Sequence, residues 1–181
     1  MNNDKWVYTE FENIDFELFQ SIAGEVIGTD DYEITQTETD AKYDADITLK
    51  TTNKQIAIEI KNRYNINSNT TYRINDFDTF NLNYAKYKHL EALACTRPTY
   101  LVVFYPTDKK ALVWQITNET RHYPNKQVEV PKFTLTNDGN LTKWQKQFPI
   151  NKARVIDIPE EAIDKMRSRI KDLRKRMKNN D

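Results

Sequence analysis

The stretches YDADITLK (residues 43–50), TTNK (51–54) and QIAIEIK (55–61) indicate two β-strands joined by a polar turn. Apolar and polar residues alternate in both stretches, and a period of two is typical of a strand with one buried face. Ile47 and Leu49 of the first stretch then share the core face with Ile56, Ile58 and Ile60 of the second. The charged residues between them are predicted to lie together on the opposite face.

A two-residue turn at Thr52 and Asn53 would place Asp46 opposite Glu59, with Lys61 next to them on the same face. We therefore expect Asp46, Glu59 and Lys61 to converge on one point of the sheet. Asp44 shares this face and is the alternative aspartate, although Asp46 fits the expected register better.

Two carboxylates placed across a strand pair repel each other unless a positive charge lies between them. Mg²⁺ and Mn²⁺ prefer carboxylate and water oxygens, so a divalent ion would supply that charge. Metal-bound water is a strong nucleophile near neutral pH, and Lys61 could position that water or neutralise charge on a phosphate. The pattern therefore predicts metal-dependent phosphodiester hydrolysis.

Asp46 followed by Glu59-Ile60-Lys61 at the end of an isoleucine-rich strand resembles the core motif of the PD-(D/E)XK nuclease superfamily. The resemblance covers roughly residues 10–117 and implies a restriction-endonuclease-like sandwich. It also implies that Asp46, Glu59 and the backbone carbonyl of Ile60 bind Mg²⁺ or Mn²⁺, while Lys61 positions the attacking water. One departure is that Ala45, instead of proline, precedes Asp46.

A first helix is predicted over residues 10–26, because Phe11, Ile14, Leu18 and Ile22 recur at helical spacing. Many members of the superfamily add an acidic metal ligand from their first helix. Asp15 and Glu25 both lie near the apolar stripe of this helix. We prefer Asp15 and keep Glu25 as the next candidate.

The remaining pattern predicts strands at 32–39, 99–105 and 111–117, a helix at 76–95 and an edge strand at 154–158. TYLVVFY at 99–105 is continuously apolar, which favours a central strand buried on both faces. Residues 118–150 show no clear pattern. This order of elements predicts one α/β domain over residues 1–158, a sandwich with a mixed central β-sheet flanked by helices.

Side chains that flank the predicted centre are candidates for contact with nucleic acid. Tyrosines can stack on bases, and basic groups can contact phosphates. The candidates are Arg63, Tyr84, Tyr87 and Lys88, with Lys86 as a further phosphate contact.

Residues 159–181 predict a basic, amphipathic C-terminal helix. Ile163, Met166, Ile170, Leu173 and Met177 alternate at spacings of three and four. This seam favours packing on the domain or on a second copy, which would make a homodimer. The basic residues between them could contact DNA or RNA phosphates.

The chain has 181 residues and no net charge, yet residues 1–60 hold 14 acidic and 4 basic side chains, so the remainder is basic. A single cysteine, Cys95, excludes a disulfide framework. The sequence shows no signal region and no apolar run of membrane-spanning length, which favours a cytoplasmic protein.

The sequence thus predicts a Mg²⁺-dependent deoxyribonuclease of a phage, restriction, repair or recombination system. An RNA nuclease and a catalytically inactive nucleic-acid-binding module of the same fold are the alternatives.

Overall fold

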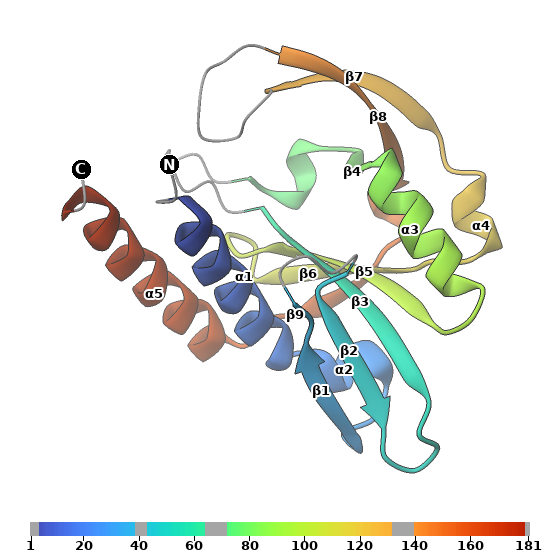
Figure 1. Ribbon diagram of the computed structural model, residues 1–181, viewed down its shortest axis with the longest axis horizontal. Coiled ribbons are helices and arrows are strands. Elements are labelled where there is room, and N and C mark those ends of the chain that lie inside the picture. Colours follow the sequence, from blue (N-terminus) through green and yellow to red (C-terminus); the bar gives the residue numbers. More distant parts are fainter. Residues whose placement is uncertain (1–3, 39–42, 64–71, 132–139, 180–181) are drawn as a thin grey trace.

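The computed structural model describes residues 4–38, 43–63, 72–131 and 140–179. Its centre is a mixed six-stranded sheet (Figure 1). In spatial order the strands are β1 (Tyr32–Gln36), β2 (Ala45–Leu49), β3 (Gln55–Asn62), β5 (Thr99–Tyr105), β6 (Lys110–Gln115) and β9 (Arg154–Asp157). β3 and β5 are parallel, and all other neighbouring strands are antiparallel.

Helices cover one face of this sheet, and a helix with a second sheet covers the other (Figure 1). The first layer holds α1 (Asp4–Gln20), α2 (Ala23–Ile27) and α5 (Glu160–Asn179). The second holds α3 (Tyr84–Ala94), the short α4 (Asn118–Arg121) and an antiparallel sheet of β4 (Thr79–Asn83), β8 (Asn140–Pro149) and β7 (Asn125–Pro131). Two short 3₁₀ turns, Ile74–Asp76 and Ile150–Lys152, complete the described elements.

Each face of the central sheet has its own apolar core. The even-numbered residues of β3 and Ile47 of β2 pack with α1, α2 and α5. The odd-numbered residues of β5 pack with α3 and β4. The predicted α/β class, the mixed sheet and the central, doubly buried strand at 99–105 are confirmed.

The predicted first helix has different limits in the structure. α1 begins at Asp4, and the helical path breaks at Ser21 and Ile22 before α2. The Ser21 hydroxyl donates to the Leu18 carbonyl at 2.7 Å, so a side chain supplies the hydrogen bond to this backbone carbonyl in the last turn of α1. α2 then ends at Gly28, whose φ of 79° is readily adopted only by glycine.

The prediction of one helix over residues 76–95 is wrong in its first half. Thr79–Asn83 forms β4, which pairs with β8, and Phe80 and Leu82 point into the second core. A spacing of two residues puts both side chains on one face of a strand and not on one face of a helix, and the strand is completed by pairing with β8, which the sequence pattern did not predict. Asn83 then caps α3 by accepting a hydrogen bond from the Ala85 N–H at 2.9 Å.

The predicted register of the β2–β3 hairpin is also wrong, by two residues. Asp46 pairs with Ala57, and Ala45 pairs with Ile58. The turn holds four residues, 50–53, because the Leu49 N–H donates to the Lys54 carbonyl and Asn53 adopts a φ of 53°. A shift of two residues preserves which side chains share a face, so the core side of both strands is as expected.

The C-terminal helix α5 packs against its own domain. α5 runs alongside α1 (Figure 1), and Ile163, Met166, Ile170 and Leu173 are buried in the same core as α1. Arg169 forms ion pairs with Glu10 and Glu17 of α1. The basic end of the chain is thereby partly neutralised by its acidic beginning. No helix among the described residues is long and apolar enough to cross a membrane.

Candidate active site

Glu59 is fully buried on β3, and its side chain points to the face of the sheet that α3 covers. Two ammonium groups reach its carboxylate. Nζ of Lys61 lies 2.6 Å from Oε1, and Nζ of Lys86 lies 3.0 Å from Oε2. Within the described residues, neither oxygen has a hydrogen-bond donor of ordinary geometry. Charge therefore does most to stabilise this carboxylate.

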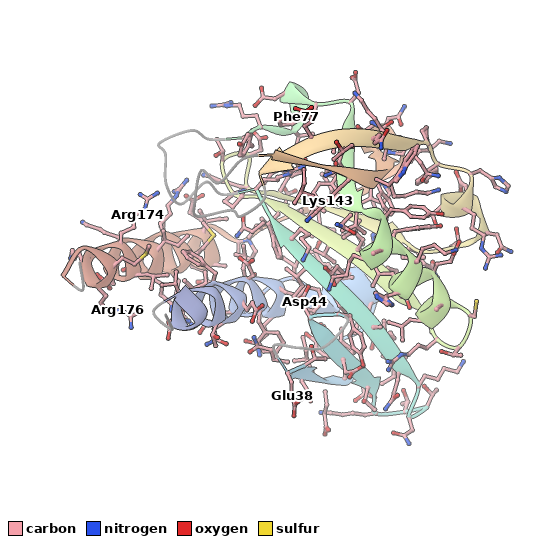
Figure 2. The ribbon with its side chains drawn as sticks, turned by 45° about the horizontal axis from the view of Figure 1, so that its top comes forward. Glu38, Asp44, Phe77, Lys143, Arg174 and Arg176 are labelled. Atoms are coloured by element: carbon pink, nitrogen blue, oxygen red, sulfur yellow. The ribbon has the colours of Figure 1, made fainter. Side chains whose placement is uncertain are left out.

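Asp44 is the second acid at this point. It immediately precedes β2, and its Oδ2 accepts a hydrogen bond of 2.6 Å from the Ile60 N–H of β3. The same oxygen lies 3.8 Å from Nζ of Lys61. Figure 2 shows Asp44 beside β3, between that strand and α1 in this view. The observed register therefore brings Asp44 together with Glu59 and Lys61.

Asp46, the aspartate favoured by the sequence, lies apart from this group. Its Oδ1 accepts a hydrogen bond of 2.9 Å from Arg97, and its Oδ2 accepts one of 2.9 Å from the Tyr43 hydroxyl. Arg97 also donates to that hydroxyl at 2.8 Å. Asp46 is thus the counter-ion of Arg97, and its expected place near Glu59 is corrected to Asp44.

Asp15 of α1 approaches the group from the other layer. Nδ2 of Asn62, at the end of β3, donates to its Oδ1 at 2.8 Å. Burial raises the pKa of Asp15 to about 7, although Asn62 and the charge of Lys61 oppose that rise. Asp44 contributes to the increase by repulsion. Glu25, the other candidate from the first helix, lies exposed in α2.

Electrostatics link the members of this group. Burial raises the pKa of Glu59, while the Lys61 ammonium opposes the rise. Burial alone would lower the pKa of Lys61, but the carboxylates of Glu59 and Asp44 raise it above its ordinary value. Lys61 therefore stays protonated near neutral pH and can act as a positive charge.

Asp15, Asp44 and Glu59 supply the oxygens that a hard divalent cation prefers. The buried Glu59 carboxylate, whose charge is now balanced by the Lys61 and Lys86 ammonium groups, fits a role as an ion ligand. In the part of the chain that the structure describes, no three acidic, histidine or cysteine side chains are gathered closely enough to hold an ion as they stand. An ion bound to Glu59 would displace at least one of the two ammonium groups that contact its carboxylate.

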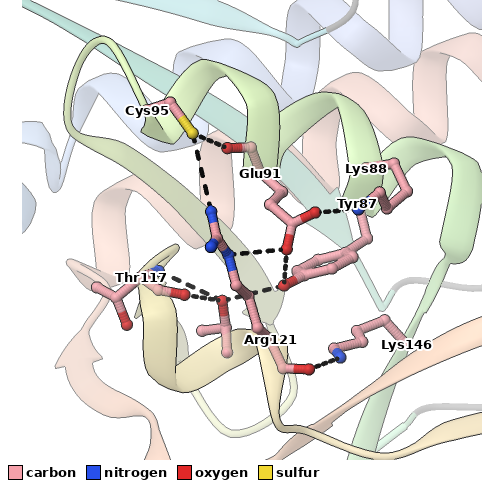
Figure 3. Close-up of polar contacts among 8 residues, drawn as sticks. Tyr87, Lys88, Glu91, Cys95, Thr117, Arg121 and Lys146 are labelled. Atoms are coloured by element: carbon pink, nitrogen blue, oxygen red, sulfur yellow. Dashed lines mark hydrogen bonds and ion pairs between the residues drawn. The ribbon is translucent and has the colours of Figure 1, made fainter.

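Tyr87 is buried and cannot contact nucleic acid, contrary to the prediction. It is 1% exposed, and its ring packs against Phe148. Its hydroxyl donates to Glu91 at 3.2 Å, and Nζ of Lys146 lies 4.8 Å from its ring centre (Figure 3). Tyr87 belongs to the polar network that joins α3 to α4 and β8.

Lys86 contacts Glu59, and the remaining three predicted nucleic-acid contacts lie in different surroundings. The guanidinium of Arg63 stacks on Phe80, 4.6 Å from the ring centre, just beyond the end of β3. Tyr84 is half-buried beside Tyr87 at the start of α3. Lys88 is exposed and pairs with Glu91 (Figure 3). Their contact with nucleic acid stays a prediction.

Sequence reasoning missed Asn62 and Arg97. Asn62 follows the Glu59-Ile60-Lys61 motif directly, so its position was a usable signal. Arg97 lies in a turn after α3, and nothing local marks it as the partner of Asp46.

No protein-family model, no curated protein and no solved structure matches this chain.

Proposed function

We propose that this protein is a metal-dependent nuclease that hydrolyses DNA phosphodiester bonds. The observation that supports it best is the meeting of Asp44, Glu59 and Lys61 at one point between β2 and β3. Two acids and one amine on neighbouring strands are what the resemblance to the PD-(D/E)XK superfamily leads us to expect. Asp44 takes the place that the sequence assigned to Asp46.

The arrangement of elements supports the same proposal. A helix, three antiparallel strands, a second helix and a strand parallel to the third follow one another as α1, β1, β2, β3, α3 and β5. This is consistent with the restriction-endonuclease-like core. β4 is inserted before the second helix, and the β4-β8-β7 sheet adds a layer to it.

Each residue then has a chemical role. Asp15, Asp44, Glu59 and the backbone carbonyl of Ile60 would hold Mg²⁺ or Mn²⁺, which supplies an activated water and neutralises phosphate charge. Lys61, protonated and 39% exposed, would orient the attacking water by hydrogen bonding and face the charge that develops on the phosphate. Asn62 would hold Asp15 in position.

A cleavage assay tests the proposal. Purified protein should cut duplex or single-stranded DNA with Mg²⁺ or Mn²⁺, and EDTA should stop it. Glu59→Gln removes one charge with little change in volume and should reduce the rate at least about 100-fold. Absence of metal-dependent cleavage on DNA, while RNA of the same sequence is cut, would instead support the RNA nuclease.

The catalytically inactive binding module is the second candidate. It is favoured by the two ammonium groups that already neutralise Glu59. Calorimetric titration separates the two candidates. Tight, salt-dependent DNA binding without heat from Mn²⁺ would favour the binding module.

A further inference from the structure

Lys86 is the second cation on Glu59, and it comes from a different element than Lys61. Lys61 follows Glu59 on β3, whereas Lys86 lies in the first turn of α3. The two ammonium groups lie near different oxygens of the carboxylate. The Lys86 side chain is 27% exposed, so it extends from the surface inward to a fully buried acid.

The position of Lys86 in α3 is unfavourable for a lysine. The amino end of a helix carries partial positive charge and favours acidic residues, yet the first turn of α3 contains none. The ion pair with Glu59 offsets this local cost. A residue that contradicts its local preference is often placed for function.

A divalent ion and the Lys86 ammonium would compete for the same carboxylate. Mg²⁺ binds oxygens at about 2.0–2.1 Å, and the Lys86 ammonium lies 3.0 Å from Oε2. Two cations so close on one buried group repel each other strongly. An ion bound through Oε2 would therefore displace the Lys86 ammonium, whereas the Lys61 ammonium lies at the other oxygen, Oε1.

We propose that Lys86 is an exchangeable counter-ion of Glu59, displaced by the metal ion and then directed to the substrate phosphate. The inference rests on the proposed nuclease function. In the metal-free protein the ammonium neutralises a carboxylate that would otherwise be buried with less compensation. After displacement it faces the charge that builds on the phosphate, where a fixed positive group lowers the barrier.

Calorimetric titration with Mn²⁺ at pH 8, without nucleic acid, tests the first half of this proposal. Lys86→Gln should bind Mn²⁺ about tenfold more tightly than the wild type, because one nearby positive charge is gone. Lys86→Arg retains the charge and should stay near the wild type. Lys88→Gln, an exposed lysine on the same helix, is the matched control and should change affinity less than twofold.

Cleavage kinetics at saturating Mn²⁺ test the second half. Lys86→Gln should lower kcat at least about tenfold with KM within about threefold, and Lys86→Arg should recover part of that loss. Damage to the fold would weaken metal binding, so tighter binding combined with slower turnover separates displacement from a structural role.

Unchanged Mn²⁺ affinity of Lys86→Gln, in a protein whose wild type cleaves, overturns the inference and leaves the nuclease proposal standing. Tighter binding with unchanged kcat overturns the transfer to the phosphate. A wild type that neither binds Mn²⁺ nor cleaves overturns both proposals.

Discussion

Nδ2 of Asn62 donates a hydrogen bond of 2.8 Å to Oδ1 of Asp15, and this contact joins the end of β3 to the helix α1 that covers the sheet. Sδ of Met166 lies 3.7 Å from the same Nδ2 group, so α5 packs against the junction. An acid from a helix is thereby held next to acids from strands. Because Asp15 is held at this contact, the pH at which it loses its proton depends on the structure around it and can be measured.

Asp15 should make the metal-free protein less stable as pH rises. Its pKa is about 7 in the folded state and 3.8 in its ordinary state, so the folded protein binds more protons between these values. Stability from the protonated form is then lost as pH rises from about 4 to 7. Urea unfolding in EDTA at pH 5, 6, 7 and 8 measures the free energy of unfolding. That of Asp15→Asn should increase relative to the wild type by up to about 1.4 kcal/mol per pH unit.

Asp46→Asn is the control for that series, because its carboxylate pairs with Arg97 elsewhere. A difference between Asp15→Asn and wild type that does not change with pH would contradict the burial of an ionisable Asp15.

The two aspartates around Ala45 should differ sharply in their effect on cleavage. Asp44→Asn should reduce the rate at least about 100-fold, because Asp44 lies within ion-pair range of Lys61. Asp46→Asn should stay within about fivefold, because it only weakens a pair with Arg97. Initial rates on one DNA substrate measure both. The reverse order would restore Asp46 as the ligand.

At neutral pH, the buried charge of Lys146 should make the free energy of unfolding smaller than it would be with an apolar side chain at this position. It is 1% exposed, and burial lowers the pKa of its ammonium. The folded protein therefore loses this proton at a lower pH than the unfolded chain, and stability rises with pH in that window below the ordinary value of 10.5. Lys146→Met should be as stable as wild type, or about 1 kcal/mol more stable, at pH 7.

Chemical unfolding at pH 7 and pH 10 checks this expectation, and the advantage of Lys146→Met should shrink at the higher pH. Lys143→Met on the same strand serves as the control. A large loss of stability at pH 7 would mean that the hydrogen bond of Lys146 to the Arg121 carbonyl outweighs its desolvation.

Leu173→Ala should destabilise the protein by about 2–5 kcal/mol, because Leu173 is fully buried where α5 packs on the domain. Arg167→Ala, on the exposed face of α5, should change stability by less than about 0.5 kcal/mol. Thermal unfolding at two protein concentrations measures both effects. A small, concentration-dependent effect of Leu173→Ala would mean that the seam packs on a second copy instead.

The sequence predicted the central strands well, because the pattern of their apolar residues is compatible with only one type of secondary structure. TYLVVFY at 99–105 is too short and too uniformly apolar for anything but a buried strand in this context. Glu59 and Lys61 were assigned to one face because Ile56, Ile58 and Ile60 alternate with them, and the structure brings them together. Asp15 was preferred to Glu25 from its place on the helix stripe, and only Asp15 reaches the group.

The choice between Asp44 and Asp46 was not accessible from local pattern. Both lie on the same face, and only the length of the turn distinguishes them. The second sheet was missed because β7 and β8 are rich in polar residues and carry few apolar ones. Without β8, the pairing that makes Thr79–Asn83 a strand could not be anticipated.

The length of the four-residue turn at 50–53 sets the register of β2 against β3. That register places Asp44, and not Asp46, beside Glu59 and Lys61. Chains of this architecture with a two-residue turn should carry their acid two positions later, at the equivalent of Asp46. The number of residues between the aspartate of the second strand and the Glu-x-Lys motif would then differ among such chains, while the spatial arrangement of the three side chains stays the same. Searches for such chains would do better to allow the spacing and the turn to vary together.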